Sequence, residues 1–313
     1  MDTLAVVLEE PRQLGLERLR LDPREDDDLL VDIAWSGIST GTERLLYTGE
    51  MPAFPGMGYP LVPGYESIGR VLEAGATSKA SVGDMVFVPG ARCFGDVRGL
   101  FGGAAARVVV PSARVTKVEA EWGESAVLLA LAATARHALV LDGVAPPDLI
   151  VGHGVLGRLL ARVSIASGFE PPTVWDTNPE RRGGACGYAV LDPIADERRT
   201  YRSIFDVSGG AGILDTLVQR LAPGGEIVLA GFYAAPLSLS FPPAFMREAR
   251  FRVAAEWRPH DLDAVVDLVA SGRLSLDGLI THRSAAKSAA EAYRTAFDDP
   301  ACLKMILDWR DCS

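Results

Sequence analysis

The sequence predicts an α/β protein in which a mostly-β N-terminal domain precedes a domain built on a doubly wound parallel sheet. Up to about residue 144, short apolar segments end in Gly or Pro, as in a compact antiparallel β domain. From residue 148, strand-like and helix-like segments alternate, which is typical of a parallel sheet covered by helices on both faces. The length of 313 residues suits about two domains.

The N-terminal elements are short strands. Residues 4–10 and 29–35 have strand composition, and the acidic stretch between them is expected to be a solvated connection. Further strands are expected at residues 67–75, 82–89 and 105–111. Residues 124–141 are rich in Ala and Leu and lack Gly and Pro, which predicts a helix. His137 within it is expected to be a satisfied interior or helix-surface histidine.

The second half of the chain alternates between the two types of element. Strands are expected at residues 148–153, 172–178, 188–193, 204–209 and 225–233, with helices at 154–168 and 212–224. The tail beyond about residue 260 carries helices at 261–272 and 286–299 and strands at 279–283 and 303–309. Composition leaves open whether the tail extends the parallel sheet or folds back onto the N-terminal domain.

Charge and composition exclude several function classes. A net charge of −10 argues against binding to nucleic acid or to anionic lipid, which both need clustered Lys and Arg. The N-terminal segment has no basic region, and the longest apolar run, residues 126–135, is much shorter than a membrane span. We therefore expect a cytoplasmic protein whose four dispersed cysteines are reduced thiols.

A glycine-rich turn carries the strongest functional signal. Gly152, Gly154 and Gly157 form a GxGxxG motif that follows an apolar strand and opens a helix. The first glycine permits a tight turn, the second lets the backbone approach a pyrophosphate, and the third lets helix and strand pack closely. We expect the whole turn to bind a dinucleotide: Gly152, His153, Gly154, Val155, Leu156 and Gly157. His153 is expected to be a phosphate neighbour or a spacer.

An acidic residue follows the next predicted strand. Asp176 lies at about the spacing from the turn at which an acid meets the ribose hydroxyls of the adenosine. A carboxylate there repels a 2′-phosphate, so the sequence favours NAD over NADP. Arg181 and Arg182, a few residues on, could soften that preference.

Motifs spread over nearly the whole chain resemble those of the medium-chain dehydrogenase/reductase superfamily. They are VPGYESIGRV, VGDMVFV, LAATARHAL, VGHGVLG, FDVSG, LAPGGEIVLAGF, ITHR and LKMIL. The resemblance implies a GroES-like catalytic domain of residues 1–144 and 265–313 and a Rossmann domain of residues 145–264, with substrate in the cleft between them. It also implies that Thr134, Gly231 and Phe232 face the nicotinamide, with Ser208 of FDVSG among the cofactor-binding residues. Homodimerisation through Rossmann edge strands near residues 226–232 is a further expectation.

The positions that hold zinc in members of that superfamily carry other residues here. Ser39 stands where zinc members have Cys, Tyr65 where they have His, and Ala130 at the third ligand position. Glu66 is retained but cannot hold the ion alone, since a catalytic zinc needs about three protein ligands. Cys93 also stands alone, so the structural zinc lobe is missing. We expect no metal.

Within the superfamily, four longer stretches resemble the bacteriochlorophyllide dehydrogenases: SGISTGTERLL, FPGMGYPLVPGYES, VFVPGARCFG and GLFGGAAARVVVP. This resemblance implies NAD-linked oxidation of a 3-(1-hydroxyethyl) group on a bacteriochlorophyllide to 3-acetyl. It also leaves room for transient contact with a membrane surface where this apolar substrate is exchanged. The competing hypotheses are a zinc-free NAD(P)H reductase of quinones or enones, and a non-catalytic NAD-binding protein.

Without metal, a hydrogen-bond network must take the alcohol proton. Ser39, Thr42, Tyr65 and Glu66 are the candidates. Tyr65 is expected to bond the substrate oxygen and pass its proton on, or else to fill the space that zinc vacated. Ser39 and Thr42 are expected either to relay the proton or to cap a turn, and Glu66 to support the site. Glu43, in the same loop, is expected to face solvent.

The glycine-rich stretch of residues 94–106 is the candidate binding region for a large flat ring. Phe94, Leu100 and Phe101 are expected to stack on a macrocycle, and Arg98 to meet a propionate. The alternative interpretation is a mobile surface loop.

Overall fold

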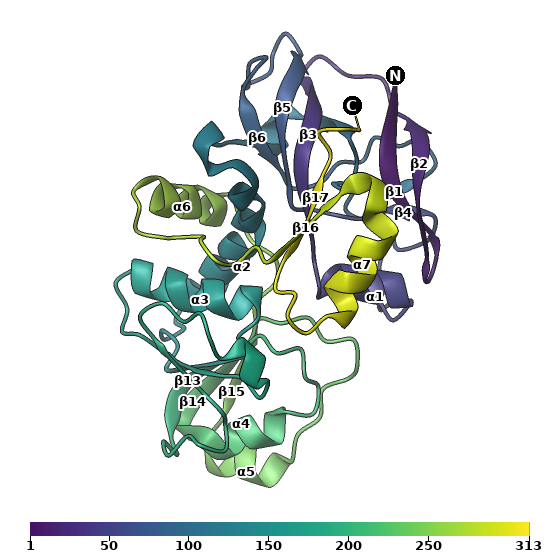
Figure 1. The fold of residues 1–313 in the computed structure, drawn as a ribbon. Helices are drawn as coiled ribbons and strands as arrows, with labels where there is room; N and C mark the ends of the chain where they lie inside the picture. The colour runs from purple at the N-terminus through teal and green to yellow at the C-terminus, as the bar shows by residue number, and fades with distance from the viewer. Residues whose placement is uncertain (313) are drawn as a thin grey trace. The chain divides into compact units, whose positions relative to one another are not determined.

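The computed structural model describes residues 1–312, and the chain divides into two units (Figure 1). The first unit contains Met1–Ala130 and the chain from Leu279 onward, and the second contains Leu131–Gly278. The sequence predicts domain boundaries after residues 144 and 264. These boundaries would assign helix α2 (Leu129–Leu139) and part of α6 (Pro259–Ala270) to the first unit. Both helices group with the second unit instead, apart from the first two residues of α2, and a hydrogen bond of 2.9 Å between His137 of α2 and Asp261 of α6 joins them.

Two β-sheets form the first unit. The smaller follows the order β2-β1-β4-β7, with β1 (Asp2–Glu10) antiparallel to β2 (Gln13–Arg20). Its other strands are β4 (Leu61–Val62) and β7 (Arg98–Gly99). In the larger, seven-stranded sheet, β3 (Asp28–Ile38) pairs with three neighbours, namely β5 (Ser67–Ala74), β8 (Arg107–Pro111) and β17 (Met305–Asp308). The remaining strands are β6 (Met85–Val88), β9 (Thr116–Lys117) and β16 (His282–Ala285).

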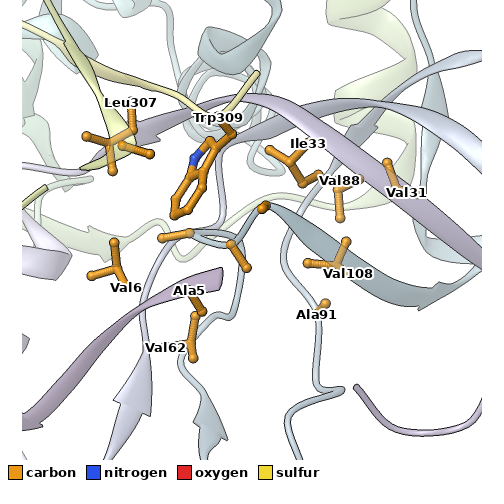
Figure 2. Packing of buried hydrophobic residues seen from close by; sticks show 14 of the residues in the cluster. Ala5, Val6, Val31, Ile33, Val62, Val88, Ala91, Val108, Leu307 and Trp309 are labelled. Carbon is orange, nitrogen blue, oxygen red and sulfur yellow. The ribbon is translucent and has the colours of Figure 1, made fainter. Parts of the chain in front are cut away.

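From Leu279 onward, the C-terminal tail folds back onto the N-terminal domain, whereas its first helix, α6, groups with the second unit. Strand β17 runs antiparallel to β3, and helix α7 (Ala289–Asp298) buries Tyr293 and Phe297. Trp309 follows β17, is fully buried among Val6, Ile33 and neighbouring side chains, and donates its indole N–H to a serine hydroxyl of β3 (Figure 2). The alternative that composition left open is thereby decided, because the tail pairs with a strand of the first unit.

A six-stranded, all-parallel sheet forms the second unit, which confirms the predicted α/β fold class. The order is β12-β11-β10-β13-β14-β15. Its strands are β10 (Leu149–Val151), β11 (Thr173–Trp175), β12 (Ala189–Leu191), β13 (Tyr201–Asp206), β14 (Leu221–Leu229) and β15 (Arg250–Val253). The strand order reverses at β10 and β13, and in such sheets ligands bind beyond the carboxyl ends of the strands at that point.

The remaining helices complete the two units. Helix α1 (Thr42–Thr48) belongs to the first unit, and α3 (Val155–Ala166), α4 (Leu214–Arg220) and α5 (Phe241–Met246) belong to the second. The predicted helix over residues 124–141 is split: Ala120–Leu128 consists of 3₁₀ turns interrupted by a kink at Gly123, and the α-helix begins only at Leu129. Over residues 1–312, no helix combines the length and apolar character needed to cross a bilayer.

Candidate active site

The glycine turn has the geometry that the motif requires. Gly152 has a φ of +104°, where any other residue would be strained, and it packs against the backbone of Ser208. A Cβ on Gly157 would lie 1.8 Å from the carbonyl oxygen of Gly152, so only glycine allows this contact between helix and turn. A Cβ on Gly154 would meet nothing within 4 Å, and Gly154 is the N-cap of α3 without a side-chain cap. The start of α3, including Val155 and Leu156, therefore offers backbone N–H groups to an anion.

Asp176 is held beside this turn. Its Oδ2 accepts the backbone N–H of His153 at 2.8 Å, and its Oδ1 accepts that of Asn178 at 2.8 Å. Each carboxylate oxygen can accept a second hydrogen bond, so the side chain is fixed in place and still able to bind hydroxyls. These residues fit an adenosine ribose next to a pyrophosphate.

His153 joins the turn to the loop that follows Asp176. Its ring is fully buried, with Nδ1 2.5 Å from the carbonyl oxygen of Arg181 and Nε2 2.8 Å from the hydroxyl of Tyr188. Burial lowers its pKa to about 4, so the ring is neutral at pH 7. Arg158 of α3 donates to the carbonyls of His153 and Arg181. The glycine motif does not reveal that Arg158 and Tyr188 hold this loop and the ring of His153 in place.

The remaining cofactor candidates lie in three places. Ser208 follows β13 and is exposed, and its amide is held by the side chain of Asp206. Gly231 follows β14, and a Cβ there would lie 3.3 Å from the amide nitrogen of Gly209. Ser208 and Gly231 thus lie at neighbouring strand ends, on the edge where Gly152 lies. Phe232 is half-exposed, and Thr134 lies on α2 with part of its surface accessible.

Tyr65 and Ser39 meet in the first unit. The hydroxyl of Tyr65 lies 2.9 Å from Oγ of Ser39 and also hydrogen-bonds the side chain of Thr42. Ser39 is buried, whereas Tyr65 and Thr42 keep part of their surface accessible. Of the predicted hydroxyl network, Tyr65 and Thr42 are therefore the residues with accessible surface.

Glu66, the residue after Tyr65, forms an ion pair that the sequence motifs do not reveal. Its Oε2 is 2.6 Å from Nζ of Lys304, and both side chains are buried. Lys304 also donates to the carbonyl of Ile38. Oε1 of Glu66 is buried without a hydrogen-bond partner. A lysine inside the apolar segment LKMIL was the one available sign of this partner.

Glu43 does not face solvent, and that prediction was wrong. It is 1% exposed, its Oε2 accepts the hydroxyl of Tyr293 at 2.6 Å, and its Oε1 accepts the backbone N–H of Ser39 at 3.0 Å. Helix α1 turns this side chain into the unit, where α7 brings Tyr293 to meet it. Burial raises the pKa of Glu43 to about 7, because a carboxylate in an apolar interior loses its hydration.

The residues at this site do not fit a zinc ion. Ser39, Tyr65 and Ala130 offer no thiolate or imidazole, and the ammonium of Lys304 next to Glu66 would repel a cation. Within residues 1–312, no group of three or more His, Cys, Asp and Glu side chains is arranged to hold a metal ion. The chemistry available here is therefore that of hydroxyls backed by carboxyl groups.

The proposed pigment-binding stretch is more tightly packed than predicted. Phe94 and Leu100 are buried in apolar cores, so neither can stack on a ligand. The glycines of residues 94–106 serve packing: a Cβ on Gly102 would lie 1.9 Å from the carbonyl oxygen of Ala91. Phe101 keeps accessible surface, and its ring meets that of Tyr65 edge-on with centroids 5.4 Å apart. Arg98 is exposed and donates to the carbonyl of Tyr59 at 3.2 Å.

The sequence is similar to those of two bacteriochlorophyllide dehydrogenases. The family model of the alcohol dehydrogenase GroES-like domain matches residues 25–120. The chain is 59% identical to 2-desacetyl-2-hydroxyethyl bacteriochlorophyllide A dehydrogenase of Rhodobacter capsulatus, over 99% of each chain. It is 58% identical to the protein of the same name from Cereibacter sphaeroides, again over 99% of each chain.

Solved structures share the fold. An alcohol dehydrogenase from Escherichia coli, complexed with NADH, aligns with a TM-score of 0.84 and 21% identity over 98% of this chain and 99% of that one. The 2R,3R-butanediol dehydrogenase of Bacillus subtilis aligns with a TM-score of 0.82 and 20% identity, over 98% and 99%. With its GroES-like β unit, its parallel-sheet unit and full-length relatives at 58–59% identity, the chain belongs to the medium-chain dehydrogenase/reductase family.

Proposed function

We propose that the protein oxidises the 3-(1-hydroxyethyl) group of a bacteriochlorophyllide to a 3-acetyl group in bacteriochlorophyll biosynthesis, with NAD as hydride acceptor and without zinc. The observation that carries this proposal is the hydroxyl pair of Tyr65 and Ser39, 2.9 Å apart, at the positions where zinc members of the family hold metal. Full-length identity of 59% to a dehydrogenase named for this pigment supports the substrate.

The nicotinamide ring, when bound, supplies the acceptor for the hydride that leaves the carbinol carbon. The residues of this chain handle the proton. Tyr65 is neutral, since burial and the carboxyl groups of Glu66 and Glu43 raise its pKa above its ordinary value. A neutral phenol donates a hydrogen bond and takes up a proton only as it passes its own proton on. Ser39 and Thr42, bonded to the Tyr65 hydroxyl, are the proposed recipients.

The preference for NAD over NADP is proposed from Asp176. Its carboxylate is fixed by the amides of His153 and Asn178, so it cannot swing away from a 2′-phosphate without losing two hydrogen bonds. Arg181 lies nearby, but its carbonyl is engaged by His153 and Arg158, which fixes its backbone. An immobile carboxylate at the ribose disfavours the phosphorylated cofactor.

For the pigment, we propose Phe101 and Arg98 as contacts. Phe101 touches Tyr65 and has accessible ring surface, so it can stack on a macrocycle whose side chain reaches the Tyr65 hydroxyl. Arg98 lies on β7, uses one nitrogen for the Tyr59 carbonyl and keeps its guanidinium exposed, as a propionate partner requires.

We also propose a homodimer formed in the cytoplasm. The segment predicted for pairing, residues 226–232, lies mostly in β14, which is paired on both sides, and the edge strand next to it is β15. Val253 of β15 and Phe245 of α5 are 73% and 65% exposed, which favours coverage by a second copy. Sedimentation of the purified protein tests this, and a monomer at micromolar concentration would contradict it.

The test of the function is a defined reaction. Purified protein is mixed with NAD⁺ and 3-(1-hydroxyethyl)bacteriochlorophyllide a, and NADH is measured together with the absorption of the pigment. We expect NADH and acetyl pigment in equal amounts, unchanged after treatment with a chelator, and much slower turnover with NADP⁺. Cofactor binding without turnover would favour the non-catalytic binder, and NADPH-dependent reduction of a quinone would favour the reductase.

A further inference from the structure

The polar cluster of the first unit contains one more carboxyl group than ammonium group. Glu43, Glu66 and Lys304 are each at most 1% exposed. The ammonium of Lys304 lies 2.6 Å from Glu66 and compensates that carboxylate. A second carboxylate in the same apolar surroundings has no cation of its own, and an uncompensated buried charge is costly. Glu43 is therefore the carboxyl group for which the neutral and the ionised form are close in free energy.

The groups in direct contact with the Glu43 carboxyl group are uncharged hydrogen-bond donors. Tyr293 of α7 donates its hydroxyl, and Ser39, just after β3, donates its amide. Farther off, Glu66 repels the ionised form and Lys304 attracts it. Burial outweighs the two hydrogen bonds and raises the pKa of Glu43 to about 7. The carboxyl group of Glu43 can therefore gain or lose a proton near neutral pH.

Ser39 contacts both this carboxyl group, through its backbone N–H, and the Tyr65 hydroxyl, through its side chain. Its Oγ lies 2.9 Å from the Tyr65 hydroxyl, and its amide donates to Oε1 of Glu43. The charge of Glu43 also acts on Tyr65 directly and raises its pKa. Tyr65 therefore holds its own proton firmly, and a proton that arrives from a substrate must move to a group with a vacancy.

We propose that Glu43 is the proton acceptor behind Tyr65, taking the hydroxyl proton of the substrate during oxidation. The inference rests on the proposed function. The C–H bond breaks and its electron pair leaves with the hydride to the nicotinamide cofactor, while a C=O double bond forms. The O–H bond of the substrate breaks and its proton passes to the Tyr65 oxygen, while the Tyr65 O–H bond breaks and that proton passes to Oγ of Ser39. The Ser39 hydroxyl releases its own proton in turn, and the ionised carboxylate of Glu43, which the Ser39 amide holds next to this residue, takes it up. Glu43 does not touch the substrate and acts through Tyr65.

The first test needs no substrate. Infrared difference spectra of the purified protein are recorded between about pH 5 and about pH 8, the range over which a group with this pKa titrates. We expect a protonated-carboxyl band that disappears as pH rises and is missing in Glu43→Gln. In Tyr293→Phe the same band should persist to higher pH, because the lost hydrogen bond stabilised the carboxylate. Glu50→Gln, an exposed neighbour after α1, is the matched control and should retain the band.

The second test is the pH profile of pigment oxidation. In the wild type, kcat/KM should rise with pH through one ionisation near pH 7 and then level off. Glu43→Gln should remove this ionisation and fall roughly tenfold or more below the wild type at about pH 8, with a smaller gap at about pH 6. A purely structural role of Glu43 would lower activity equally at both pH values.

The two tests separate this inference from the proposed function. A pigment that is oxidised by wild type while no infrared band depends on Glu43 overturns the acceptor role alone. A band that depends on Glu43 in a protein that never oxidises the pigment overturns the proposed function, and the acceptor role with it. Equal pH profiles for wild type and Glu43→Gln also overturn the acceptor role.

Discussion

Nζ of Lys304 lies 2.6 Å from Oε2 of Glu66, and both side chains are withdrawn from solvent. The pair joins the segment before β17 to the start of β5, from opposite ends of the chain. Its ammonium also donates to the carbonyl oxygen of Ile38, the residue before Ser39. The lysine ammonium thus supplies the counter-ion that the buried Glu66 carboxylate needs.

Removing one member of this pair should destabilise the protein. Lys304→Met leaves the Glu66 carboxylate buried without a counter-ion and should cost roughly 3–5 kcal/mol of unfolding free energy. Lys304→Met combined with Glu66→Leu should recover most of that loss, because no charge is left unpaired. Urea unfolding measures the stability of both variants. If Lys304→Met alone were as stable as the wild type, the ion pair would not be compensating the buried charge of Glu66.

Glycine at position 37 should be required by the same pair. A Cβ there would lie 2.3 Å from Oε2 of Glu66, and Lys304 holds this oxygen in place. Gly37→Ala should lower the free energy of unfolding by roughly 1–3 kcal/mol. Gly15→Ala is the matched control, since a Cβ there meets nothing within 4 Å. Equal losses in the two variants would refute the steric explanation.

Stability should depend on pH through Glu43. Its pKa is about 7 in the folded protein and near 4.5 in the unfolded chain, so the folded state binds the proton more tightly between these values. The contribution is fully present below about pH 4.5 and is lost as pH rises through about 7. Relative to Glu43→Gln, the wild type should lose up to about 3 kcal/mol between about pH 5 and about pH 8. Parallel stability curves for the two proteins would contradict this.

Tyr65→Phe tests the hydroxyl that we propose contacts the substrate. The variant keeps the edge-on contact with Phe101 but loses the hydrogen bond to Ser39, so turnover should fall roughly tenfold or more. Binding of NAD⁺, measured by calorimetry, should stay unchanged. Unaltered kinetics would remove Tyr65 from the mechanism.

Asp176→Ser tests the choice of cofactor. The shorter side chain removes the fixed carboxylate, so NAD⁺ binding should weaken about tenfold while NADP⁺ binding improves relative to it. Asp215→Asn, at the start of α4, serves as the control with an exposed carboxylate in the same unit. A variant that keeps the wild-type ratio of the two affinities would show that Asp176 does not select the cofactor.

Much of the fold could be predicted from local patterns. The alternation of strands and helices after residue 148 gave the parallel sheet, and the glycine spacing predicted the turn at Gly152 and Gly157. Both signals are periodic or local, so neighbouring residues in the sequence carry them. That positions 39 and 65 carry hydroxyl groups and no thiolate or imidazole was likewise readable from residue types.

The partners inside the cluster were decided by tertiary structure alone. Lys304 and Glu66 are separated by 238 residues, and Tyr293 and Glu43 by 250. Pairing of β17 with β3 brings the tail to these carboxyl groups, and no local pattern encodes which distant side chains then meet. A charged residue is usually exposed, so Glu43 was expected at the surface. What the sequence determined by itself was the set of chemical groups; which of them lost water and gained a partner depended on long-range packing.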